Sequence, residues 1–111
     1  MRFSGAAPVS QVELRTADSF TSRLVGLAGR RAPSPDTGLL LTGTRAVHTF
    51  GMRYALDLVW LDRAGRVIRV DRALPPRRFA ACAKARAVIE LAAGGADRAG
   101  LAPGAIAPVR F

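Results

Sequence analysis

The clearest pattern in this chain is an apolar run, a short polar turn and a second run in which apolar and polar residues alternate. Residues 55–61 are apolar on both faces except for Asp57, which predicts a central strand covered on both sides. Residues 62–65 begin with Asp and end with Gly, as in a type I turn closed by a glycine bulge. Residues 66–72 return as the second arm, so the pattern predicts a β-hairpin.

The remaining predicted elements are shorter. Alternation or short apolar runs predict further strands, at residues 9–15, 38–42, 85–92 and 106–111. Helical spacing predicts one main helix, capped by Thr16 and stopped by Gly29, and a helical turn or two over residues 96–101. We expect residues 1–8 to form a loose arm, residues 74–82 an extended connection, and residues 9–111 a single domain.

Few helices among many short strands are typical of an α+β fold. A strongly bent mixed sheet, or a small barrel-like sheet, with the main helix packed against it would bury the predicted apolar faces. The single cysteine, Cys82, excludes an internal disulfide and suits a reducing compartment. The chain contains no apolar run of about 18 residues and no signal-peptide pattern, so we expect a cytoplasmic protein without a membrane span.

The net charge of +9 first suggests nucleic-acid binding. The basic residues are 16 Arg and one Lys, beside 21 Ala and 11 Gly, which is the mixture that a GC-rich coding bias produces. They are spread along the chain, and no ladder of aromatic residues interleaves with them. These observations favour a solvated, solubilising surface over nucleic-acid binding, although Arg-mediated binding of an anion or nucleic acid stays an alternative.

Four side chains are candidates for catalysis. His48 is the only His, and Asp57 and Glu90 are carboxylates flanked by apolar residues in predicted strands. Cys82 lies between alanines in electropositive company, which can lower the pKa of a thiol. Each also has a structural interpretation. His48 can be a hydrogen-bonded structural His, and Cys82 a small buried hydrophobic residue. Asp57 and Glu90 can pair with Arg or accept hydrogen bonds from backbone N–H groups. Their spacing matches no metal motif, and no cofactor fingerprint is present.

A candidate ligand pocket lies around the central hairpin. The residues predicted to line it are His48, Met52, Arg53, Asp57 and Trp60. Trp60, Phe50 and Met52 are expected to form core, with an aromatic rim on the pocket as the alternative.

An ordered set of short motifs runs along the chain: Gly26-Leu27 with Gly29-Arg30, His48-Thr-Phe-Gly-Met52, Leu56-Asp57, Leu61-Asp62 with Gly65 and Val67, Glu90-Leu91 with Gly94, and Gly100-Leu101 with Gly104. This ordered set resembles the domain of unknown function 192 family. The resemblance covers residues 9–110 and implies a compact, β-rich α+β domain without an established activity. Where the family commonly has a Trp-Met-Lys-Asn-type run, this chain has Thr49 to Arg53. Some members resemble proteins encoded near pilus or secretion machinery, which implies an accessory role.

Three hypotheses follow for the function. The first is a non-catalytic accessory domain that binds a protein or a small molecule at the pocket near the hairpin. The second is a small hydrolase or transferase using His48 with Asp57, Glu90 or Cys82, which requires the His and a carboxylate to lie within hydrogen-bond reach. The third is Arg-mediated binding of an anion or nucleic acid, which would weaken steeply with salt.

Overall fold

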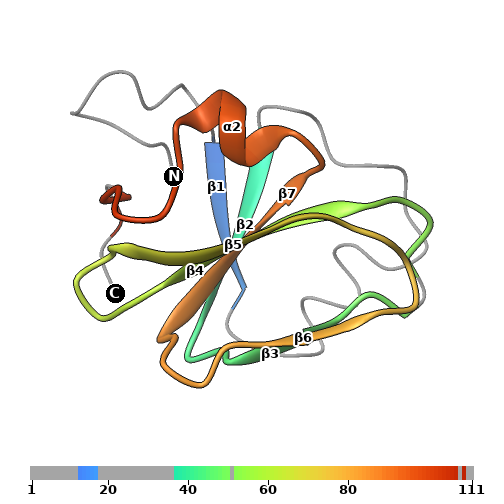
Figure 1. The fold of residues 1–111 in the computed structure, drawn as a ribbon, viewed down its shortest axis with the longest axis horizontal. Helices are drawn as coiled ribbons and strands as arrows, with labels where there is room; N and C mark the ends of the chain where they lie inside the picture. Colours follow the sequence, from blue (N-terminus) through green and yellow to red (C-terminus); the bar gives the residue numbers. More distant parts are fainter. Residues whose placement is uncertain (1–12, 18–36, 51, 108, 110–111) are drawn as a thin grey trace.

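Antiparallel strands dominate the fold, as Figure 1 shows. The computed structural model describes residues 13–17, 37–50, 52–107 and 109. Its strands are β1 (Glu13–Ala17), β2 (Thr37–Thr42), β3 (Ala46–His48), β4 (Leu56–Leu61), β5 (Val67–Leu74), β6 (Phe79–Ala81) and β7 (Ala87–Ala92). In these ranges the one helix is the short α2 (Gly95–Ala99). The predicted α+β class is therefore confirmed.

The strands form two sheets. A five-stranded sheet has the order β1-β2-β7-β4-β5, with β1 parallel to β2 and the other neighbours antiparallel. A separate antiparallel ribbon consists of β3 and β6. The larger sheet is mixed, as predicted, and it is open, so the barrel-like alternative is not what forms.

The predicted hairpin is β4–β5. The backbone carbonyl of Asp62 accepts a hydrogen bond from the Gly65 N–H (3.0 Å), which closes the turn. Gly65 has a φ angle of +82°. The positive φ angle favours glycine, and a Cβ at Gly65 would also lie only 3.0 Å from the Ala107 carbonyl oxygen, which would have to shift to make room. The pairing register shifts between Trp60 and Leu61, as expected for a bulge beside this turn.

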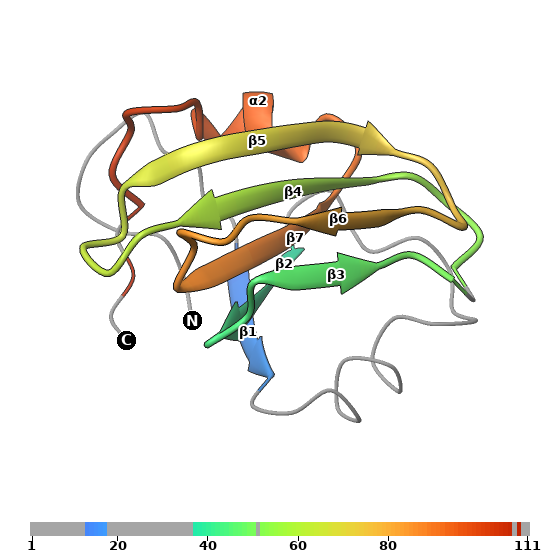
Figure 2. The same ribbon diagram turned by 60° about the horizontal axis from the view of Figure 1, so that its bottom comes forward.

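Side chains of β4 alternate between two apolar cores. Val59 and Leu61 pack with α2, whereas Leu56, Leu58 and Trp60 pack with residues of the β3–β6 ribbon. The five-stranded sheet therefore lies between α2 on one face and the ribbon on the other, an arrangement visible in Figures 1 and 2. This double cover explains why all six residues of β4 are buried.

Three sequence predictions differ from the structure. Thr16, predicted to cap the main helix, lies within β1, and the strand continues to Ala17; the rest of the predicted main helix, like residues 1–8, lies outside the described residues. Residues 79–81, predicted as part of a connection, form β6. Of the predicted closing strand at 106–111, the described residues contribute only a bridge between Ile106 and Arg66. Across the described ranges, no helix is long and apolar enough to cross a membrane.

Candidate functional site

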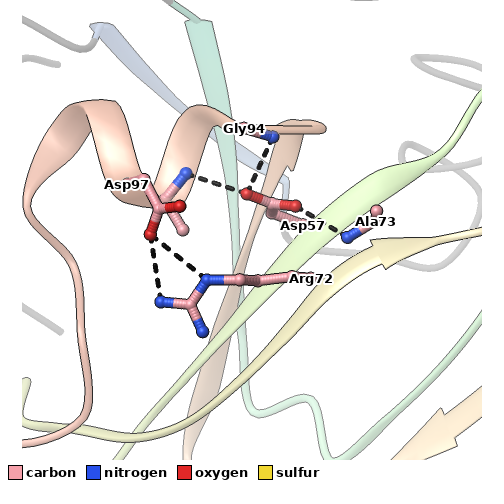
Figure 3. A network of polar contacts seen from close by, with 6 residues as sticks. Asp57, Arg72, Ala73, Gly94 and Asp97 are labelled. Carbon is pink, nitrogen blue, oxygen red and sulfur yellow. Dashed lines mark hydrogen bonds and ion pairs between the residues drawn. The ribbon is translucent and has the colours of Figure 1, made fainter.

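Asp57 in β4 is enclosed by backbone N–H groups. Its Oδ1 accepts a hydrogen bond from Ala73 (2.9 Å), and its Oδ2 accepts two, from Gly94 (3.1 Å) and Ala96 (3.0 Å), as Figure 3 shows. The side chain is 1% exposed. Because α2 has no side-chain cap of its own, Asp57 satisfies N–H groups at the start of that helix. The carboxylate thus joins β4, the end of β5 and α2.

Asp57 and Glu90 lie on opposite faces of the five-stranded sheet. Asp57 is paired in register with Leu91, which packs in the α2-side core. Glu90 is paired with Leu58, which packs in the ribbon-side core, and it is 2% exposed. Directly opposed residues share a face, so the two carboxylates point apart. In the ranges that the structure describes, no three His, Cys, Asp or Glu side chains gather as a metal site.

Trp60 is fully buried, with its polar edge bound to Asp71. Its Nε1–H donates to Asp71 Oδ2 (2.9 Å), and the Arg69 guanidinium contacts both carboxylate oxygens (2.7 and 3.1 Å). Burial pushes the pKa of Asp71 upward, but the hydrogen bonds from Arg69 and Trp60 outweigh it and hold that pKa below its usual value. The same hydrogen bonding to Asp71 raises the pKa of Arg69.

The outward face of the β3–β6 ribbon carries exposed aromatic rings. His48 is directly opposite Phe79, and because the neighbouring pair Val47–Ala80 is buried, His48 and Phe79 face away from the core. Phe79 is 66% exposed and Phe50 is 54% exposed. The rings of His48 and Phe50 have centroids 5.8 Å apart. His48 therefore lies between Phe50, its ring neighbour, and Phe79, its cross-strand partner, and the three aromatic residues form a row.

Thr49 is hydrogen-bonded to the backbone of two arginines next to this row, Arg77 and Arg78. Its buried hydroxyl donates to the Pro75 carbonyl (2.7 Å) and accepts from the Arg78 N–H (2.8 Å). The Thr49 N–H donates to the Arg78 carbonyl (2.8 Å), and the Arg77 N–H donates to the Thr49 carbonyl (3.3 Å). Both arginine side chains are exposed. We call the set His48, Phe50, Arg77, Arg78 and Phe79 the aromatic–arginine surface.

The residues predicted to line a ligand pocket are divided between surface and core. Arg53 is exposed and His48 is half-buried. Met52 and Trp60 are buried together in the ribbon-side core, whereas Asp57 is buried on the other face of the sheet. Of the catalytic candidates, Cys82 is a free thiol, partly buried against the ribbon-side core.

The sequence does not identify Phe79 or the supporting residue Thr49, because their importance depends on contacts between β3 and β6. Phe50, expected in the core with an aromatic rim on the pocket as the alternative, is more than half exposed. The adjacency of Phe79 to the Arg77-Arg78 doublet was the available signal in the sequence.

The family follows from comparison with known proteins. The model of DUF192, described as Uncharacterized ACR, matches residues 2–107. The chain belongs to this family. A UPF0127 protein of Pyrococcus horikoshii is 35% identical over 81 residues, which is 70% of each protein. The resemblance seen in the sequence motifs is thereby confirmed, and it names no activity.

Two solved structures are similar to this DUF192 chain. A protein of Sinorhizobium meliloti 1021, named as a candidate transcription regulator, has a TM-score of 0.75 and 24% identity, covering 86% of this chain and 79% of its own. A protein of unknown function from Novosphingobium aromaticivorans has a TM-score of 0.73 and 20% identity, covering 84% and 71%. At these identities the likeness establishes the fold alone.

Proposed function

We propose that this DUF192 domain is a non-catalytic binding domain whose ligand contacts the aromatic–arginine surface. The observation that carries the proposal is the row of rings formed by Phe50, His48 and Phe79 on the outside of the ribbon. Large exposed apolar side chains that cluster on a surface mark interaction sites. Within the described residues such side chains are Phe50, Phe79 and Ile106, and two of these three belong to this surface.

The hydrogen bonds of Thr49 support the proposal because they hold the surface in place before a ligand arrives. Thr49 connects the residues after β3 to those before β6 through its hydroxyl and both of its backbone groups. A surface that is already ordered loses less conformational entropy on binding. From the sequence-predicted pocket, His48 belongs to this surface and the exposed Arg53 follows Phe50 by three residues, and we assign both to ligand contact.

The enzymatic alternative loses one of its three versions. It pairs His48 with Asp57, Glu90 or Cys82, but both Asp57 oxygens accept backbone hydrogen bonds on the far face of the five-stranded sheet. We therefore propose an accessory role with a protein, small-molecule or polymer partner. The free thiol of Cys82 suits a reducing compartment, and we place the activity in the cytoplasm.

Amide NMR spectra recorded during titration test the proposal. The probes are oligothymidylate, polyglutamate and phosphatidylglycerol vesicles, and the matched control is the Phe79→Ala variant. We expect saturable shifts at residues 46–50 and 77–81 for at least one probe, and their loss in the variant. Shifts confined to residues 94–97, or no saturable shift with any probe, would contradict the proposal. Turnover of a substrate that His48→Ala abolishes would favour the enzymatic alternative instead.

A further inference from the structure

The positive charge of the protein is concentrated around the ribbon. Residues 43–56 and 75–89, which contain β3, β6 and their flanking loops, hold six of the 17 basic residues and none of the eight acidic ones. All six are exposed: Arg45, Arg53, Arg77, Arg78, Lys84 and Arg86. A coding bias explains a high number of arginines, but it does not explain the exclusion of acids from these two segments. The ligand expected here is therefore an anion.

The fold also supplies what the sequence lacked for nucleic-acid binding. No aromatic ladder interleaves with arginine along the chain, but pairing of β3 with β6 brings Phe50 and His48 next to Phe79 and the Arg77-Arg78 doublet. Exposed rings bind unpaired bases by stacking, largely regardless of sequence. Arginine adds bidentate contacts to phosphate and stacks its guanidinium plane on bases.

We propose that the aromatic–arginine surface binds single-stranded nucleic acid. Bases stack on the exposed rings of Phe79 and Phe50, and backbone phosphates contact Arg77 and Arg78. This inference rests on the proposed function and names the ligand class for the same surface. A duplex is disfavoured because its bases are already stacked on one another, and an acidic peptide gains nothing specific from exposed ring faces.

Anionic membrane is the other polyanion with an affinity for arginine and apolar side chains. The rest of the outward ribbon face disfavours it, because the neighbouring cross-strand pair is Ala46–Ala81, whose methyl groups add little apolar area for insertion. Two exposed phenylalanines next to small alanines provide ring faces for stacking, but they do not form a broad apolar patch.

Fluorescence anisotropy with labelled oligothymidylate of about ten nucleotides tests the inference. The informative pair is Phe79→Tyr, which keeps the ring, and Phe79→Leu, which keeps only the apolar bulk. Stacking predicts that Phe79→Tyr binds within about twofold of the wild type and that Phe79→Leu binds about tenfold more weakly. Equal binding by both variants would overturn the role of stacking.

The arginine contribution is tested by two double variants of equal charge. Arg77→Gln with Arg78→Gln removes the doublet, whereas Arg63→Gln with Arg66→Gln removes two exposed arginines at the hairpin turn, beyond the other end of β4. The first should weaken binding and reduce the salt slope by about 1.4, since each phosphate contact to a single strand contributes about 0.7. The second should change the affinity less than about twofold. Equal effects of the two double variants would mean non-specific attraction and would overturn the inference.

Competing ligands distinguish failure of single-strand binding from failure of the proposed binding function on which it rests. A duplex that binds as tightly as the single strand overturns the inference. Saturable binding of polyglutamate or phosphatidylglycerol vesicles at the ribbon, without oligothymidylate binding, also overturns it but leaves the surface a binding site. Absence of saturable binding by all probes overturns both. Preserved cooperative unfolding followed by Trp60 fluorescence confirms that each variant is folded.

Discussion

The α2 face of the five-stranded sheet and the outer face of the ribbon, here called the ribbon face, treat their conspicuous side chains in opposite ways. On the α2 face, the conspicuous polar group is Asp57, and three backbone N–H groups occupy its two oxygens. On the ribbon face, the conspicuous groups are Phe50 and Phe79, which pack little against the protein and remain more than half exposed. A buried carboxylate can look functional in a sequence and prove structural, whereas an exposed ring next to arginine is available to a ligand.

Charge reinforces this contrast. Near α2, the exposed Arg72 is paired with Asp97 (3.1 Å), so a positive group there has a negative partner. The ribbon segments contain basic residues without any acid. The α2 face is therefore expected to govern stability, and the ribbon face to govern binding. Substitutions on each face can test this division.

The largest effect is expected for Asp57→Ala. Removing the carboxylate leaves three backbone N–H groups without their acceptor, those of Ala73, Gly94 and the buried Ala96, which should lower the free energy of unfolding by about 3–5 kcal/mol. Urea unfolding followed by Trp60 fluorescence measures this loss. Asp57→Asn, which keeps one acceptor oxygen, is the matched control and should lose less. A loss below about 1 kcal/mol for Asp57→Ala would show that α2 does not depend on this carboxylate.

Thr49→Val should have the next largest effect, now on the ribbon face. The substitution preserves shape but removes the hydroxyl that binds Pro75 and Arg78, and we expect a loss of about 1–3 kcal/mol in stability. Unlike Asp57→Asn, it should also weaken oligothymidylate binding, since it loosens the segment that carries Arg77 and Arg78. Thr49→Ser, which keeps the hydroxyl, should restore both properties. A binding loss shared equally by Asp57→Asn and Thr49→Val would contradict the division between the faces.

Local patterns made one part of this architecture predictable. The β4–β5 hairpin was recognisable because its turn residues and its strands are adjacent in sequence. The buried carboxylate at Asp57 was also recognisable, and acceptance of backbone N–H groups was among its predicted interpretations. Which N–H groups it binds was not, because they lie 16, 37 and 39 residues further along the chain.

The binding surface was harder to predict for the same physical reason. Thr49 meets Arg78 across 29 residues, and the row of rings exists only after β3 and β6 pair. Pro75 and Pro76 indicate an irregular connection, and the three-residue strand β6 that begins three residues later has no pattern of its own to predict it. Three-residue strands such as β3 and β6 are too short to show alternation clearly, so the hydrophobicity of Phe50 favours a core position over the alternative of a pocket rim.

A smaller and pH-dependent effect is expected at Asp71, which lies on β5 and accepts a hydrogen bond from the buried Trp60. Its pKa is lowered in the folded protein, so its carboxylate stabilises the fold above the pKa of the unfolded chain, about 3.9, and this contribution disappears as the pH falls through the lower folded value. Asp71→Asn should therefore lower stability by at most about 1 kcal/mol at neutral pH. The difference from the wild type should vanish under strongly acidic conditions. Urea unfolding at a series of pH values measures it, and a difference independent of pH would contradict the assignment.

The smallest effect is expected for Arg72→Ala, although Arg72 lies close to the Asp57 network in Figure 3. Its partner Asp97 has a side chain that is 71% exposed, and Arg72 itself is 46% exposed, so water and salt screen their attraction. We expect a loss below about 0.5 kcal/mol in urea unfolding, becoming smaller at high salt. Asp97→Ala should behave in the same way if the ion pair is the whole interaction. A loss above about 1 kcal/mol for either variant would mean that the surface pair supports the backbone contacts of Asp57, and the polar network of the α2 face would then have to be treated as one cooperative unit.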